Sequence, residues 1–364
     1  MIRLRDIFTR FAPDYLKRYG HAMPRGHLRA LRDISVCRTD RMGVHVEQCD
    51  DCGDRRLVPH SCRNRLCPSC HNAEIQDWIA TRAADVLPAP YFHLTFPLPS
   101  EYRMLIRANQ KALGQAAMQA AAESLAVLAQ DRLGGKAGMM IAFHTWGRSL
   151  PWHPHVHCLV PGLVVHPDNT IRVLNPKFLV PVCALSRIYR AVFLRKARAA
   201  LPGVRMPEPP GKRSWVVHCR PCREGPQNVI RYLARYARRG PLHESSIISA
   251  DDQAVVFRYR DHRTQKLKTC TLSPCDFMAR YLQHAPPKGF HRVRYYGILA
   301  PGARRTLRAA QLQFMQRLLI IAAHLAQLRE PCENRPPHRC PQCGGTHFTR
   351  FGFRGPARPL CRSP

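Results

Sequence analysis

The sequence contains a pair of histidines whose spacing suits a divalent metal ion. Residues 152–160 read WHPHVHCLV, a run that is apolar and β-branched enough to form a strand. Alternate residues of a strand share one face, so His155 and His157 would point to the same side and could hold a metal with a third ligand from a neighbouring strand. About one His-x-His pair is expected by chance among 19 histidines in 364 residues, so a surface histidine cluster also explains the spacing.

A second pattern supplies candidate nucleophiles. Residues 227–239 read QNVIRYLARYARR, and helical periodicity places Tyr232 and Tyr236 on one face. The basic residues around them, which are candidates for DNA binding, are Arg231, Arg235, Arg238 and Arg239. An amphipathic helix whose tyrosines pack on a core would show the same pattern. Beside a metal site, however, the pattern meets the needs of phosphotyrosine chemistry, in which a metal polarises a phosphate, a tyrosine oxygen attacks it and arginines stabilise the developing charge.

The cysteines indicate zinc. Pairs of the form C-x2-C should occur about 0.7 times by chance among 16 cysteines. The pairs present are Cys49/Cys52, Cys67/Cys70, Cys219/Cys222 and Cys340/Cys343. The first two are separated by 14 residues, a spacing typical of two knuckles that give four thiolates to one tetrahedral zinc ion. We therefore expect one zinc site formed by Cys49, Cys52, Cys67 and Cys70.

Other residues could extend this zinc chemistry. Further candidate ligands that could form a second zinc site are Cys37, His45, His60, Cys62 and His71. Cys37 and Cys62 could instead be small buried residues. The knuckle at Cys340 and Cys343 lacks a second cysteine pair, so it is either a further zinc site or a decayed ribbon. The residues near it that could complete a site are Cys332, His338, His347 and Cys361. Cys219 and Cys222 are interpreted as structural.

Charge and composition restrict the class of protein. The chain carries 57 basic and 24 acidic residues, a formal net charge of +33, and 45% of its residues are hydrophobic. A folded protein with so large a positive charge is expected to bind a polyanionic partner, either nucleic acid or an anionic membrane surface. No secretory signal is visible and the apolar run at 318–328 is too short to cross a bilayer, so we expect a cytoplasmic protein with no membrane partner. No G-x-x-x-x-G-K-[ST] motif is present, which argues against a nucleotide cofactor.

The predicted elements position these residues on an antiparallel sheet. We expect strands at 91–96, 139–146, 155–160, 214–219, 254–260 and 267–272. Helices are expected at the amino terminus and at 73–86, 101–133, 180–200, 227–239 and 304–329. This order predicts an α+β fold, because a doubly wound fold would alternate strands and helices regularly. The predicted domains are a helix and zinc-binding domain at 1–88, a catalytic domain at 89–303, and a helix with a Cys/Pro-rich tail at 304–364.

Several motifs in order along the chain resemble one family. They are SCRNRLCPSC at 61–70, YFHLTFPLP at 91–99, HTWGR at 144–148, HPHVHCLVPG at 153–162, FLVPVCALSRIYR at 178–190, WVVHC at 215–219, YLARYARR at 232–239 and PKGFHRVRYYGIL at 287–299. Together they resemble the insertion sequence 91 family of transposases, which are two-tyrosine HUH (His-hydrophobic-His) rolling-circle enzymes. The resemblance runs from about residue 35 to about residue 305. At Leu66 the sequence departs from the family, which commonly carries a histidine there.

The resemblance implies an HUH-endonuclease-like antiparallel sheet with flanking helices, preceded by a small zinc-ribbon-like domain. It implies rolling-circle transposition, in which the enzyme nicks and transfers single-stranded DNA at element ends and target. Tyr232 and Tyr236 would form 5′-phosphotyrosine links, and His155 and His157 would bind Mg²⁺ or Mn²⁺. We expect His144 as the third ligand in preference to His93. The alternatives are a non-catalytic zinc-ribbon protein that binds nucleic acid, and a plasmid replication initiator or relaxase.

Overall fold

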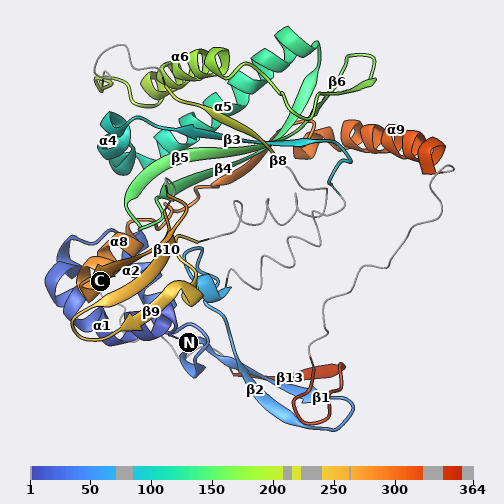
Figure 1. Ribbon diagram of the computed structural model, residues 1–364. Helices are drawn as coiled ribbons and strands as arrows, with labels where there is room; N and C mark the ends of the chain where they lie inside the picture. The colour runs from blue at the N-terminus through green and yellow to red at the C-terminus, as the bar shows by residue number, and fades with distance from the viewer. Residues whose placement is uncertain are drawn as a thin grey trace.

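The described residues form an upper body built on a large antiparallel sheet and a lower body of helices with two small sheets (Figure 1). The computed structural model describes residues 2–70, 85–207, 215–222, 240–261, 264–322 and 339–354. The predicted α+β class, with an antiparallel sheet and flanking helices, is confirmed.

The upper body is organised around a sheet whose order is β7-β6-β4-β5-β3-β8 in the described chain, with β12 also paired to β4. Its strands are β3 (Tyr91–Pro97), β4 (Lys136–Trp146), β5 (Trp152–Pro161), β6 (Leu163–Val165), β7 (Ile171–Val173), β8 (His218–Cys222) and β12 (Val293–Gly297). The hairpin predicted from 139–146 and 155–160 is confirmed as the antiparallel pair β4–β5. This hairpin and β3 carry the histidines considered below.

Helices cover one face of this sheet. They are α4 (Arg103–Ala108), α5 (Gln110–Leu133) and α6 (Val182–Ala200). Alternate apolar residues of the strands, such as Leu94, Phe143 and Val156, are buried in one core with Leu113 and Tyr189 of these helices. Because side chains alternate along a strand, the histidines between these residues lie on the other face.

The helix expected over 101–133 is divided. A 3-10 turn, η3 (Ser100–Tyr102), leads into α4, and Asn109 then leaves the helical conformation with φ −123° and ψ 43°. The Asn109 side-chain amide donates to the backbone oxygen of Leu105 at 3.1 Å, and such local bonds compete with the regular helix. The end at Gly134 is as predicted, since this glycine adopts φ 67° and caps α5.

The lower body joins the amino-terminal helices to a later segment. Its main elements are α1 (Leu4–Tyr19), α2 (Arg25–Ser35), α8 (Pro274–Leu282), β9 (Ile247–Ala250), β10 (Val255–Arg260) and β11 (Leu267–Leu272). Short 3-10 turns lie at η1 (Gly20–Ala22), η2 (Asp40–Met42), η4 (Glu244–Ser246) and η5 (Pro301–Ala303). Phe8 and Tyr281 meet edge to face with ring centroids 5.7 Å apart, so α1 and α8 share one core.

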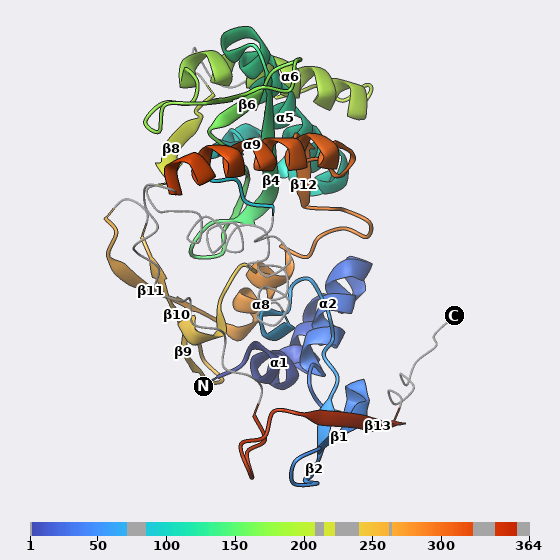
Figure 2. The same cartoon turned by 90° about the vertical axis from the view of Figure 1, so that its right-hand side faces the viewer.

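Two further units involve the end of the chain. The helix α9 (Arg304–Ala322) packs Leu307 and Phe314 against Leu163 and Ile171 of the upper sheet (Figure 2). The strand β13 (Phe348–Arg354) pairs antiparallel with β1 (Val44–Cys49), which pairs in turn with β2 (Arg55–Pro59). Segments from all three predicted domains are therefore in contact, while the division at residues 88 and 303 stays a prediction.

Further predicted strands and helices match the structure in part. The strand expected at 214–219 is displaced to β8, and Trp215 and Val217 are buried outside a strand. The β10–β11 hairpin and the helix at 180–200 are confirmed within a few residues. The helices expected at 73–86 and 227–239 lie outside the described residues. Among the helices that are described, none combines the length and apolar character needed to span a bilayer.

Gly297 at the end of β12 is expected to tolerate no side chain. Its φ is +60°, and an added Cβ would lie 1.8 Å from the backbone oxygen of Ala137. We expect Gly297→Ala to lower the free energy of unfolding by about 3 kcal/mol, at the upper end of ordinary substitutions. Urea denaturation measures the effect, with Gly302→Ala as control because its methyl group meets nothing within 4 Å. Equal stability of the two variants would contradict this packing of β12 on β4.

Candidate metal centre

Three histidines from two neighbouring strands meet on the sheet face away from α5. His144 on β4 lies directly opposite His155 on β5, and His157 follows on the same face of β5. Their ligand nitrogens all lie within 4.8 Å of one another. The structure thus brings together the predicted pair and the residue expected as third ligand.

The orientation of His155 leaves one nitrogen available to a metal. Its Nδ1 lies 2.7 Å from the backbone oxygen of His153. A carbonyl oxygen only accepts, so Nδ1 carries the proton and Nε2 presents its lone pair. That Nε2 lies 2.9 Å from Nε2 of His157. The two nitrogens that would bind a metal therefore point at the same place.

His93 on β3 belongs to the surroundings of this cluster. Its Nε2 lies 2.9 Å from Nδ1 of His157, and the two rings stack with centroids 5.0 Å apart. A histidine that binds metal through Nε2 usually donates its other N–H to a partner that fixes the ring. His93 is placed to accept that bond from His157.

Burial keeps these imidazoles neutral. His144 and His155 are 4% and 9% exposed. Burial lowers the pKa of both His93 and His155 to about 4. The pKa of His157 lies well below its ordinary value, because of burial first and then the nearby His155. Neutral imidazole is the form that ligates metals, so His155 and His157 are prepared as ligands at neutral pH.

Two residues of β8 extend this face and were missed by the sequence reasoning. Arg220 pairs with His93, and His218 pairs with Thr95, so both share the face of the histidine cluster. Both side chains are exposed. The predicted strand ended at Cys219, which left Arg220 outside it. The alternation of His218, Cys219 and Arg220 is the sequence pattern that could have predicted Arg220 on the same strand face as His218. In the structure Cys219 lies opposite the buried Leu94, so its two neighbours lie on the other face.

Four cysteines lie together in the lower core, which also contains the amino-terminal helices. They are Cys37, Cys62, Cys67 and Cys70. Cys37 Sγ lies 3.5 Å from Cys70 Sγ and 3.6 Å from Cys67 Sγ, and Cys62 Sγ lies 3.6 Å from Cys70 Sγ. Zn–S bonds of about 2.3 Å in a tetrahedron place sulfurs about 3.8 Å apart, so this donor set fits zinc. Leu66 beside it is buried among apolar residues, and the ligand set is complete without a histidine there.

The predicted grouping of Cys49, Cys52, Cys67 and Cys70 around one ion is wrong. Cys49 and Cys52 lie instead with Cys340 and Cys343. The reason is β2, whose five residues run from the first knuckle back toward the helices and span about 16 Å at 3.3 Å each. The knuckle at Cys49 and Cys52 and the knuckle at Cys67 and Cys70 therefore lie beyond opposite ends of this strand and cannot share a metal.

The remaining candidate ligands do not join a metal cluster in the described part of the chain. His45 contacts Glu47 at 3.2 Å and stacks on His60. Cys219 pairs with Leu94 within the sheet, in keeping with its structural interpretation. Several other predicted residues lie outside the described residues, namely His71, Cys332, His338, Cys361, Tyr232, Tyr236, Arg231, Arg235, Arg238 and Arg239.

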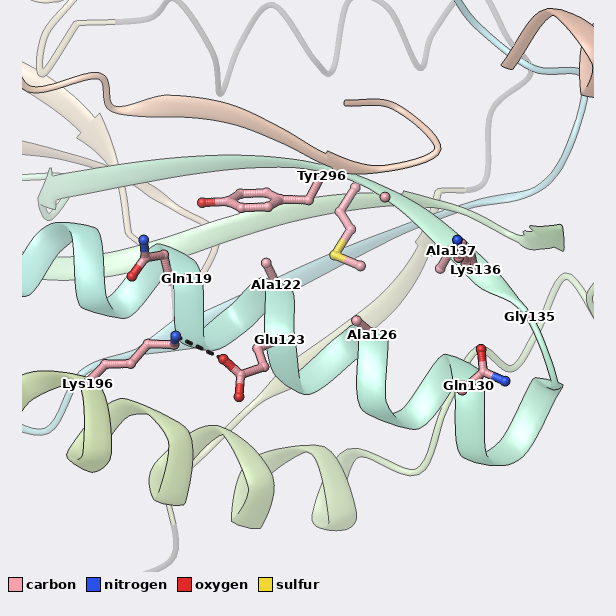
Figure 3. A pocket seen from close by; sticks show the side chains of 12 residues that line it. Gln119, Ala122, Glu123, Ala126, Gln130, Gly135, Lys136, Ala137, Lys196 and Tyr296 are labelled. Atoms are coloured by element: carbon pink, nitrogen blue, oxygen red, sulfur yellow. Dashed lines mark ion pairs between the residues drawn. The ribbon is translucent and has the colours of Figure 1, made fainter. Parts of the chain in front are cut away.

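A cavity of ≈ 560 Å³ lies on the opposite, helix-covered side of the sheet. Figure 3 shows Glu123 of α5 and Lys196 of α6 at its wall, joined by an ion pair of 2.9 Å, with Tyr296 of β12 above them. No histidine or cysteine lines it. The cavity is therefore separate from the metal chemistry.

Comparison with known proteins identifies the family. A family model described as "Putative transposase" matches residues 138–307, and one described as "Transposase zinc-binding domain" matches residues 7–98. The "Putative transposase y4qJ" of Sinorhizobium fredii is 35% identical over 81% of this chain and 79% of its own. The "Transposase for insertion sequence element IS801" of Pseudomonas savastanoi pv. phaseolicola is 28% identical over 90% of this chain and 85% of its own. No solved structure matches the chain.

The chain belongs to the insertion sequence 91 family of transposases. It is therefore a DNA-processing enzyme whose net charge of +33 suits its polyanionic partner. The region of the zinc-binding model contains the complete cluster at Cys37, Cys62, Cys67 and Cys70, so this part of the transposase binds zinc. The region of the other model contains all three clustered histidines and both predicted tyrosines.

Removing one ligand of the amino-terminal cluster is expected to release its zinc. Cys67 is 1% exposed and packs in the lower core, so Cys67→Ser should lose one zinc equivalent from dialysed protein and lower the melting temperature by several degrees. Atomic emission and thermal denaturation measure both effects. Cys183→Ser, on the exposed surface of α6, is the control. Unchanged zinc content in Cys67→Ser would exclude this ligand assignment.

Proposed function

We propose that this transposase cuts and rejoins single-stranded DNA at element ends and target through 5′-phosphotyrosine intermediates, as in rolling-circle transposition. The observation that carries the proposal is the cluster of His144, His155 and His157 on one sheet face. The family membership and the tyrosine pair at Tyr232 and Tyr236 support it.

The three histidines would hold a divalent ion, Mn²⁺ or Mg²⁺. Three imidazole nitrogen donors fit such a centre and leave coordination positions free for phosphate oxygens. When bound, the ion supplies Lewis-acid polarisation of the scissile phosphate. Imidazole suits Mn²⁺ better than Mg²⁺, which prefers oxygen ligands, so Mn²⁺ is expected to support the higher activity.

The protein's own groups would carry out the exchange of bonds. The Oη of Tyr232 or Tyr236 would lose its proton and attack phosphorus to form the new O–P bond, and the P–O3′ bond would break so that the 3′ oxygen takes up a proton and becomes a free 3′-hydroxyl. The phosphodiester energy is kept in the tyrosine link, so no nucleotide cofactor is needed. A second tyrosine lets the enzyme hold one strand while it attacks another.

Cations from two segments of the chain would neutralise the phosphates. Arg231, Arg235, Arg238 and Arg239 accompany the tyrosines in sequence. Arg220 lies exposed on β8, on the same sheet face as His93 and the metal cluster. Guanidinium groups contact phosphate oxygens through two donors at once, which suits them to the charge that develops on the reacting phosphate.

A covalent protein–DNA adduct is the expected product. Labelled single-stranded oligonucleotide carrying an element end, incubated with protein and Mn²⁺, should yield an adduct that migrates with the protein on denaturing gels. Tyr232→Phe/Tyr236→Phe should abolish it, because no phenol oxygen remains to attack. His155→Ala/His157→Ala should reduce its rate at least about 100-fold, because phosphate polarisation is lost.

Two matched variants test specificity. Tyr259→Phe changes a tyrosine on β10, and His21→Ala changes an exposed histidine in η1, so both should retain the adduct. Persistence of the adduct in the double tyrosine variant would disprove the assignment of Tyr232 and Tyr236 as nucleophiles. Full activity in the double histidine variant would disprove the assignment of His155 and His157 as metal ligands.

His93→Ala is expected to weaken Mn²⁺ binding about 10–100-fold, the usual cost of removing a partner that orients a metal ligand. The reason is the loss of the 2.9 Å contact to Nδ1 of His157. Electron paramagnetic resonance of free Mn²⁺ gives the affinity. His93→Gln supplies an amide oxygen that can accept the same bond, so it should recover most of the affinity. Equal weakening in both variants would show that His93 matters only for packing.

A further inference from the structure

The first and last C-x2-C pairs of the chain lie together in the structure. The four sulfurs of Cys49, Cys52, Cys340 and Cys343 form one group. Cys49 Sγ lies 3.8 Å from Cys343 Sγ, and Cys52 Sγ lies 3.6 Å from Cys340 Sγ. These separations match the edge of a tetrahedron of thiolates around zinc, about 3.8 Å.

The two turns that carry these cysteines have the same backbone hydrogen bonds. In the first, Gly53 N donates to Cys49 O at 2.8 Å and Cys49 N donates to Asp54 O at 2.8 Å. In the second, Gly344 N donates to Cys340 O at 2.8 Å and Cys340 N donates to Gly345 O at 2.7 Å. Each turn is thus a knuckle of the same geometry.

The conformation of each knuckle depends on a glycine at the same position. Gly53 has φ +75° and Gly344 has φ +78°, in the region that favours glycine. Each follows directly on the second cysteine of its pair. The sequence pattern C-x2-C-G is therefore folded identically at positions far apart in the chain.

Backbone pairing brings the two knuckles together. The strand β13 lies against β1 with Phe348 opposite Cys49, and Asp50 N donates to His347 O at 3.0 Å. The contact is close, since a Cβ at Gly345 would lie 1.9 Å from Asp51 Oδ2. Arg56 of β2 also lies over the ring of Phe348 at 5.0 Å. Figures 1 and 2 both show β13 alongside β1.

We propose that Cys49, Cys52, Cys340 and Cys343 bind a second structural Zn²⁺, which joins the carboxy-terminal segment 339–354 to the amino-terminal hairpin. Four thiolates select zinc as a closed structural site. Cys340 and Cys343 lie outside both matched family regions, 7–98 and 138–307. The described residues therefore provide two zinc sites that share no ligand.

Zinc content of purified full-length variants tests this proposal independently of DNA cleavage. We expect two equivalents in the unaltered chain and one in Cys340→Ser/Cys343→Ser. Cys49→Ser/Cys52→Ser should lose the same single equivalent, and combining all four changes should lose no more, because the pairs serve one ion. Cys219→Ser/Cys222→Ser, a matched C-x2-C change on β8, should keep both equivalents.

Two equivalents remaining in Cys340→Ser/Cys343→Ser would overturn the proposal, as would iron in place of zinc. A second measurement avoids variants that might misfold. After zinc removal by a chelator, mild oxidation of the unaltered protein should join a peptide containing Cys49 or Cys52 to one containing Cys340 or Cys343. Mass spectrometry identifies this disulfide. Links from the first knuckle to Cys67 or Cys70 alone would instead support a single site.

Discussion

The antiparallel register of β3, β4 and β5 is the constraint on which the candidate site depends. It sets His144 opposite His155 and places His157 diagonally beside them. The same register turns Val156 and Phe143 into the core beneath α5. A slip of one residue would exchange the two faces, burying imidazoles among apolar helices and exposing the core. Fold stability and assembly of the histidine cluster are therefore fixed by one set of strand pairings.

Buried imidazoles need partners, and the sheet provides them in series. The backbone oxygen of His153 accepts from His155, the two Nε2 atoms of His155 and His157 face each other, and Nδ1 of His157 faces His93. A buried polar network of this kind is stable only when each member is satisfied. In the proposed metal centre, an ion bound between the Nε2 atoms would satisfy the two lone pairs that otherwise oppose each other.

Local patterns in the sequence predicted the elements well and the long-range contacts poorly. The alternation of 152–160 was enough to place His155 and His157 on one face, and the hairpin made His144 their neighbour. The cysteines show the limit. Spacing suggested that Cys49 and Cys67 share an ion, but β2 separates them, and the true partner of Cys49 is Cys343, 294 residues away. No local periodicity reports a pairing of that kind, just as none reported the break that the Asn109 side chain makes before α5.

The zinc-binding region and the histidine cluster are physically connected through α8. Tyr281 donates to the backbone oxygen of Leu66 at 2.7 Å, beside the ligand Cys67. Just after α8, Nδ1 of His284 lies 3.1 Å from Oγ1 of Thr145, which is on β4. Nε2 of His284 lies 3.2 Å from the backbone oxygen of Leu150, which is in the connection between β4 and β5. Leu150 itself is buried in the lower core with φ 66°, a strained conformation for leucine that persists because this packing holds it. The hairpin that carries the histidines is thus anchored at its turn to the core that includes the zinc ligands, so zinc binding stabilises the core that supports β4 and β5.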